Sequence, residues 1–168
     1  REYDAVVFTM AEYMREPLEG PRPFIVPPAI DPLSPKNGEL PDETCFAICE
    51  RYGIDCGRPF VTQVSRFDPW KDPLGVIEVY RLLKREFPDL QLVLIASMAH
   101  DDPEGWAWYE RTVRRAGEDY DIHILSNLNG VGNVEVNAFQ RANVVIQKSV
   151  REGFGLVGGW ELTRDREA

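Results

Sequence analysis

The sequence predicts an α/β fold in which a Rossmann-like parallel sheet carries helices on both faces. From Asp42 onward, short apolar runs alternate with amphipathic stretches, which is the order expected of repeated β-α-β units. Residues 90–96 form a nearly continuous apolar run, typical of a strand that is covered on both faces. Right-handed crossovers between such parallel strands place helices above and below the sheet.

Helix start signals set the limits of the main elements. Asp72 is a favourable N-cap and Pro73 suits the first helical position, so a helix is expected over residues 73–87. Further helices are expected at residues 42–53, 102–116 and 135–142. Strands are expected at residues 5–8, 24–26, 60–64, 90–96, 122–125 and 144–146.

The first of these helices contains two of the three cysteines. Asp42 is expected to cap it, and one side is expected to carry Cys45, Phe46, Cys49 and Tyr52. An odd cysteine count without a Cys-x-x-Cys pair is a poor framework for disulfides or zinc. The cysteines are therefore expected to be small buried hydrophobic residues, and a reducing cytoplasmic location fits them best.

A Pro-rich stretch from Pro17 to Pro41 precedes the regular pattern. Such a composition is typical of an extended connector rather than of a core element. We therefore expect a domain boundary near Asp31, with residues 1–30 on one side and residues 31–168 on the other.

The formal net charge of the chain is -9. Nucleic acids bind through arrays of Lys and Arg, so an acidic chain without a basic stripe argues against a nucleic-acid partner. A few fixed cations in a cleft still suffice for a small anion. The sequence contains no apolar run of membrane-spanning length and no signal-peptide pattern, so no membrane partner is expected.

Two cations follow the strand predicted at residues 60–64. In an open parallel sheet, ligands bind beyond the carboxyl ends of the strands. Arg66 and Lys71 are suited to clamp a diphosphate there, because Arg offers a planar fork and Lys a compact point charge. More often, two cations in such a loop are surface residues without a shared function. The residues alone leave both interpretations open.

Two more segments follow strands at the same edge. Residues 127–130 are expected to form a turn, for which a purely structural role is favoured; contact of the main chain at Asn127 and Leu128 with a base or ribose is the alternative. Glycines in the later segment allow the backbone to pass close to a ligand, and a helix starting there adds an anion site. That segment consists of Glu152, Gly153, Phe154, Gly155 and Leu156.

Other chemistry is poorly supported. His100, Asp101 and Asp102 resemble metal ligands, but adjacent residues rarely converge on one ion, so helix capping is the favoured interpretation. His123 lies in a predicted strand and is expected to face solvent or to be hydrogen-bonded. No Gly-x-Gly-x-x-Gly motif follows the first predicted strands, and the sequence contains neither a P-loop nor a Gly-x-Ser-x-Gly elbow.

Taken together, these segments resemble the donor domain of retaining glycosyltransferases of the GT-B fold, group 1 type. Residues 64–67 with Lys71, and residues 151–156, carry the resemblance to the class. Finer features resemble the trehalose glycosyltransferring synthases within it. They are residues 65–73 (SRFDPWKDP), 101–106 (DDPEGW) and 135–142 (EVNAFQRA).

The resemblance implies a two-domain enzyme whose active site lies in the cleft between an acceptor domain and a donor domain. Residues 1–30 correspond to the end of the acceptor domain and the connector, and residues 31–168 to an incomplete donor domain. The implied reaction moves glucose from a nucleoside diphosphate glucose to free glucose. Its product is α,α-trehalose, with retention of the anomeric configuration.

The resemblance also implies roles for single residues. Arg66, Lys71 and backbone N–H groups near Gly155 stabilise the departing diphosphate, so no metal and no other cofactor is expected. Glu152 holds the sugar hydroxyls, and the leaving phosphate helps to deprotonate the acceptor. The expected partners are a nucleotide sugar, a sugar acceptor and further copies of the chain.

One departure from the family limits the resemblance. In these enzymes a second Glu lies eight residues after the first and holds the ribose, but here Trp160 stands eight residues after Glu152. Residues 157–168 are an atypical tail that does not resemble the family. Alternatives therefore stay open: a sucrose-, mannosyl- or glucan-type transferase, or a fragment without activity that binds nucleotides or oligomerises.

Overall fold

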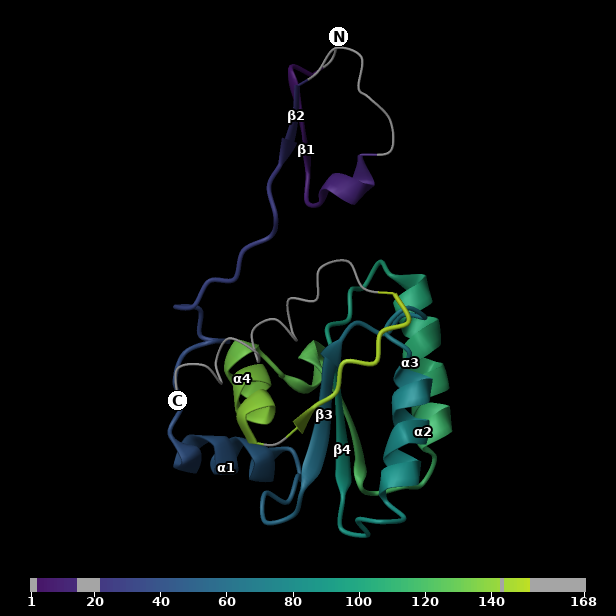
Figure 1. Cartoon of the computed structure of the whole chain (residues 1–168). Helices are drawn as coiled ribbons and strands as arrows, with labels where there is room; N and C mark the ends of the chain where they lie inside the picture. The colour runs from purple at the N-terminus through teal and green to yellow at the C-terminus, as the bar shows by residue number, and fades with distance from the viewer. Residues whose placement is uncertain (1–2, 15–21, 143, 152–168) are drawn as a thin grey trace. The chain divides into compact units, whose positions relative to one another are not determined.

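The chain divides into two compact units, Arg1–Asp31 and Pro32–Ala168. The division falls where the Pro-rich composition predicts a boundary, near Asp31. Figure 1 shows the computed structural model of the chain. It describes residues 3–14, 22–142 and 144–151.

In residues 3–14 and 22–31, the first unit contains one pair of parallel strands, β1 (Ala5–Phe8) and β2 (Arg22–Ile25). A short 3-10 helix, η1 (Ala11–Tyr13), follows β1. Two strands alone bury little surface, and the side chains of β2 are all exposed. The function of this chain is therefore best sought in the second unit.

The second unit is built on a four-stranded parallel sheet, which confirms the predicted fold class. The strand order is β5-β4-β3-β6. In the register of the sheet, Val61 lies between Leu92 and Val144, and Leu92 in turn pairs with Ile122. The strands are β3 (Phe60–Ser65), β4 (Gln91–Ala96), β5 (Ile122–Ser126) and β6 (Val144–Val145).

Helices cover both faces of this sheet. As Figure 1 shows, α1 and α4 lie on one side of it and α2 and α3 on the other. This arrangement agrees with right-handed crossovers between neighbouring parallel strands. The helices are α1 (Asp42–Arg51), α2 (Pro73–Leu83), α3 (Pro103–Ala116) and α4 (Asn133–Ala142), and a 3-10 helix, η2 (Asn127–Asn129), follows β5.

Each face of the sheet has its own hydrophobic core. All six residues of β4 are buried, as the apolar run predicts. On the face of α1 and α4, Phe139 packs with Cys49 and Ile54, and on the other face Tyr80 packs with Leu92. Burying one such large side chain stabilises the fold by about 1.5–3 kcal/mol.

Helix capping follows the prediction at two of three starts. The carboxylates of Asp72 and Asp102 accept the N–H groups of Gly75 and Gly105, at 3.0 and 2.9 Å. The prediction that Asp42 caps α1 is wrong, because Asp42 is already helical and the extended residue before it is Pro41. The end of α2 lies at Leu83, before the predicted end at residue 87.

The cysteines of α1 confirm the expected structural role. Cys45 and Cys49 are buried, and burial raises the pKa of the Cys49 thiol, so it stays protonated and unreactive. The prediction that Phe46 shares their side is wrong, since it is 51% exposed. Phe46 lies about 100° around the helix from Cys45, whereas Cys49 returns to nearly the same direction.

Candidate functional site

The order of the strands locates a topological switch point in the second unit. From β3 the chain moves outward through β4 to β5, and then returns to place β6 on the other side of β3. The crossover from β3 to β4 runs through α2 on one face of the sheet, whereas the crossover from β5 to β6 runs through α4 on the other face. Ligands of open α/β sheets bind in the crevice beyond the carboxyl ends of such strands.

The loop after β3, residues 66–72, supplies the two predicted cations at this switch point. Arg66 follows β3 directly; its side chain is 70% exposed, and its guanidinium lies 3.1 Å from the carboxylate of Asp68. Asp68 is buried, and it also accepts the backbone N–H of Lys71 at 2.9 Å. One buried carboxylate thus contacts both of the residues predicted to bind the diphosphate.

A buried amide on β3 holds the same loop from beneath. Gln63 is 3% exposed, and its side-chain N–H donates to the C=O of Lys71 at 2.7 Å. The hydrogen bonds to Gln63 and Asp68 therefore hold both polar groups of the Lys71 backbone, its C=O and its N–H. Sequence reasoning missed Gln63, whose only signal is a polar residue within a buried strand.

The segment after β6, residues 147–151, adds positive charge at the switch point. Lys148 pairs with Asp72, and the guanidinium of Arg151 lies 5.5 Å from the centre of the Trp70 ring. The two segments together carry four cationic and two acidic side chains, a net of +2 in a chain of net charge -9. Local positive charge in a cleft attracts an anion despite a negative total.

A pocket of about 220 Å³ opens beside the switch point, at the carboxyl ends of β3 and β4. The first turn of α4 and Asn127, the residue after β5, also line it. Its volume is smaller than that of most ligand pockets, so it fits part of a ligand such as a base or ribose. The polar residues of its lining are Lys36, Ser65, Ser97, Asn127 and Asn133.

Asn127 connects two loops at this edge. Its side-chain amide donates to the C=O of Met98 at 3.0 Å and accepts the N–H of Met98 at 2.7 Å. The side chain is thus engaged with the chain after β4, whereas Leu128 is 49% exposed. The expected turn is η2, closed by Gly130 at φ 80. That the main chain of Asn127 and Leu128 reads a nucleotide stays a prediction.

Other predicted residues fall in different places. Asp102 caps α3, as favoured over a metal role, and no group of three or more His, Cys, Asp or Glu is arranged for a metal within the described ranges. Glu152, Gly153, Phe154, Gly155 and Leu156 lie outside the described residues, so their predicted roles stay predictions. Lys36 of the pocket lining was missed, because it lies in the connector rather than after a strand.

No helix in the described part of the chain is long and apolar enough to cross a membrane.

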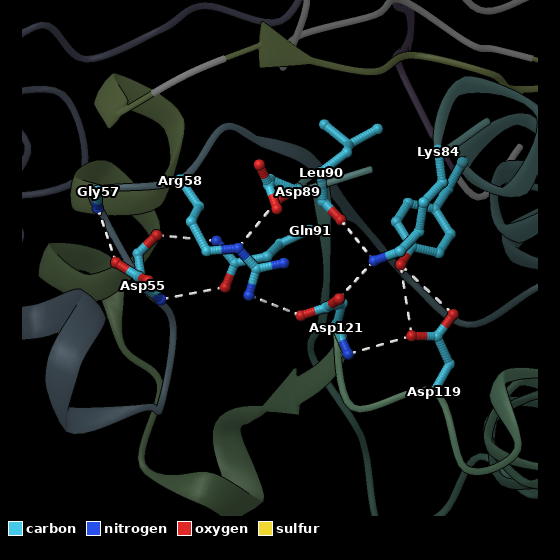
Figure 2. Close-up of polar contacts among 10 residues, drawn as sticks. Asp55, Gly57, Arg58, Lys84, Asp89, Leu90, Gln91, Asp119 and Asp121 are labelled. Atoms are coloured by element: carbon cyan, nitrogen blue, oxygen red, sulfur yellow. Dashed lines mark hydrogen bonds and ion pairs between the residues drawn. The ribbon is translucent and has the colours of Figure 1, made fainter. Parts of the chain in front are cut away.

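Among the described residues, the carboxylate with the most strongly lowered pKa lies at the amino edge of the sheet. Figure 2 shows Asp121 between two cations, with Arg58 at 2.8 Å on one side and Lys84 on the other. The bonds from Arg58 and then Lys84 lower the pKa of Asp121 to about 2. Each of these groups is paired within the cluster, which joins the amino ends of the strands, so ion pairing accounts for the lowered pKa.

His123 departs from its prediction. Its Nε2 atom is buried and has no hydrogen-bond partner in the described structure, so the ring is neither solvent-facing nor fully hydrogen-bonded. Burial lowers the pKa of His123. Protonation of this ring therefore opposes folding, and below its ordinary pKa of 6.5 it makes the fold less stable as pH falls.

We expect Asp121→Asn to lower the free energy of unfolding by about 2 kcal/mol at pH 7, the equivalent of its pKa shift. The folded pKa is lowered, so this stabilisation is present above pH 4 and is lost as pH falls to about 2. Urea unfolding across this range measures it. Glu110→Gln, which removes an exposed ion pair with Arg114, is the control and should change stability by less than about 0.5 kcal/mol. Equal effects of the two substitutions would contradict a stabilising role for the cluster.

Comparison with known proteins agrees with this geometry. The family model for glycosyl transferases group 1 matches residues 47–158. A trehalose synthase of Rubrobacter xylanophilus is 60% identical over 166 residues, which are 98% of this chain and 40% of that protein. A trehalose synthase of Thermococcus litoralis is 54% identical over 92% of this chain and 38% of that protein. The chain thus spans about two fifths of the length of these curated relatives.

Solved structures show the same fold at much lower identity. Sucrose-phosphate synthase from Thermosynechococcus elongatus has a TM-score of 0.64 at 18% identity, over 92% of this chain and 37% of that one. A UDP-forming α,α-trehalose-phosphate synthase from Burkholderia xenovorans has a TM-score of 0.63 at 17% identity, over 94% and 43%. The family match and the high identity to its relatives together show that this chain belongs to the group 1 glycosyl transferases.

Proposed function

We propose that this chain is the first part of the donor domain of a retaining glucosyltransferase that makes α,α-trehalose. The enzyme transfers glucose from a nucleoside diphosphate glucose to free glucose. The observation that carries the proposal is the pair of cations, Arg66 and Lys71, in one loop at the switch point beside a pocket. Identity of 53–60% to trehalose synthases supports the choice of product.

The chemistry requires stabilisation of a leaving group. When the glycosidic C–O bond to the diphosphate breaks, negative charge develops on the phosphate oxygens. Fixed cations stabilise that charge more in the transition state than in the ground state, and this lowers the barrier. In the proposal, Arg66 and Lys71 supply the positive charge and no metal is required. Backbone N–H groups near Gly155 complete the site.

The remaining roles rest on residues after the switch point. Glu152 holds hydroxyls of the transferred glucose, and the leaving phosphate accepts the proton of the attacking acceptor hydroxyl on the same face. Asn127 and Leu128 contact the base or ribose through their main chain, beside the pocket that Asn127 lines. Residues 1–30 belong to the end of the acceptor domain and its connector, so the acceptor site requires the rest of a longer protein.

A product assay on the full-length protein tests this function. Incubation with UDP- or ADP-glucose and ¹³C-labelled glucose should give α,α-trehalose, which NMR identifies by its anomeric signals. Fructose, mannose and a short glucan serve as competing acceptors. Transfer to one of these without any trehalose would show that the acceptor is wrong. Absence of transfer to every acceptor would contradict the enzymatic proposal. The isolated chain is expected to be inactive.

A further inference from the structure

Two segments far apart in the sequence are joined at the switch point. They are the loop after β3, residues 66–72, and the segment after β6, residues 147–151. The Nζ atom of Lys148 pairs with the carboxylate of Asp72. The two side chains are 39% and 24% exposed, so the pair is less solvated than an ordinary surface ion pair.

The backbone of Asp72 has an unusual conformation. At φ 47 and ψ 55 it is the one non-glycine residue with positive φ in the described part of the chain. One oxygen of its carboxylate caps α2 by accepting the N–H of Gly75, and the other contacts Lys148. A single carboxylate therefore binds the start of α2 and the segment after β6 together. Left-handed backbone at a non-glycine residue persists only where the surrounding contacts determine it.

Gly75 leaves the space that this ion pair occupies. A Cβ atom at position 75 would overlap both the carboxylate of Asp72 and the Nζ atom of Lys148. A side chain at position 75 would therefore force the Asp72 carboxylate and the Lys148 ammonium group to shift, although φ at Gly75 is not in the left-handed region.

Trp70 provides a second connection between the same segments. Its C=O accepts the N–H of Val150 at 2.7 Å, and the guanidinium of Arg151 lies over its ring. Trp70 and Lys71 are adjacent in the loop, and Arg151 directly precedes Glu152. The contacts therefore fasten the loop that carries Arg66 and Lys71 to residues 150 and 151 of the segment after β6.

We propose that Lys148 is a positioning residue of the donor site, acting through Asp72. It holds the loop with Arg66 and Lys71 against the segment after β6, residues 147–151. Lys148 itself contributes its charge to Asp72 rather than to the ligand. This inference rests on the proposed function, since it assigns the residue that fixes the position of the two cations of that site.

A double-mutant cycle in the full-length protein tests the proposal. Asp72→Asn keeps the helix cap and tolerates positive φ, so it removes only the charge, and Lys148→Met removes the other partner. Each should weaken UDP or ADP binding, measured by calorimetry, by about tenfold, because small displacements of binding groups are costly. The double variant should bind the nucleotide about as well as the single variant with the lower affinity, because both substitutions remove the same interaction. Lys148→Arg should recover most of the affinity.

Gly75→Ala should disturb the contact between Asp72 and Lys148 by steric overlap, and it should therefore weaken UDP or ADP binding in the same way. Glu78→Gln on α2 removes exposed ion pairs with Arg81 and Arg115 and is the matched control, with affinity unchanged. Thermal unfolding of every variant is measured as well. A midpoint well above the temperature of the binding assay shows that the variant is folded, so that weaker binding reports displacement of the loop and not unfolding.

The outcomes are distinct. Additive losses in the double variant would overturn the proposal, as would wild-type affinity in Asp72→Asn and Lys148→Met while Arg66→Ala binds weakly. A wild-type protein that binds neither UDP nor ADP would instead overturn the proposed function, and this inference with it.

Discussion

Replacing Arg66 and Lys71 together with alanine is expected to weaken nucleoside diphosphate binding by about a hundredfold or more. Each charge-assisted hydrogen bond to a phosphate contributes about 1.5–3 kcal/mol, and two losses add if the cations bind separate oxygens. The kcat for glucose transfer should fall further than the affinity, because the charge on the leaving diphosphate is greatest in the transition state. Calorimetry with UDP and ADP, followed by initial rates, measures both effects.

Arg114→Ala is the matched control for this experiment. Its side chain is 77% exposed, close to the 70% of Arg66, and it lies on α3 in an ion pair with Glu110. The substitution removes the same kind of charge from another part of the second unit. It should leave nucleotide affinity within about twofold of wild type, since exposed charges at a distance are screened by salt. Equal losses in the control and the double variant would indicate a general charge effect instead of a clamp.

The largest effect on stability is expected from Phe139→Ala, which should lower the free energy of unfolding by about 3–5 kcal/mol. The side chain is fully buried between α4 and the sheet, and its ring meets that of Tyr52 edge-on at 5.7 Å. Removing it leaves a cavity beneath the helix whose first turn lines the pocket. Urea unfolding of the chain, monitored by circular dichroism, measures the change.

Phe46→Ala provides the comparison. It removes the same side chain from α1, but Phe46 is 51% exposed, so the cost should stay below about 1 kcal/mol. Similar losses in the two variants would mean that the face of α1 and α4 is packed differently from the core described above.

Local sequence patterns predicted the elements of this fold because their causes are local. The N-caps at Asp72 and Asp102 depend on hydrogen bonds to a residue three positions away. The apolar run of β4 needs only burial on both faces. The predictions for Asp42 and Phe46 were wrong because each concerned a single position on α1. A shift of one residue moves a side chain into or out of the cap, or about 100° around the helix.

The arrangement of the candidate site depends on contacts that no local pattern contains. Lys148 and Asp72 are separated by 76 positions, and they meet only because β6 returns to the side of β3. Lys36 lines the pocket from the connector, where the rule about strand ends does not apply. The cations Arg66 and Lys71 were predicted because they follow a strand, but the roles of Gln63 and Asp68 in holding them require the folded loop.

The central claim is that a nucleoside diphosphate binds at the carboxyl edge of the sheet, at the switch point between β3 and β6. Titration of the ¹⁵N-labelled protein with UDP, followed by amide chemical shifts, tests it residue by residue. The largest shifts are predicted at residues 65–72, 97–98, 127–133 and 148–151, with small shifts at the ion-pair cluster around Arg58 and Asp121. Saturable shifts confined to that cluster, or no shifts at the carboxyl edge at saturating UDP and ADP, would contradict the account.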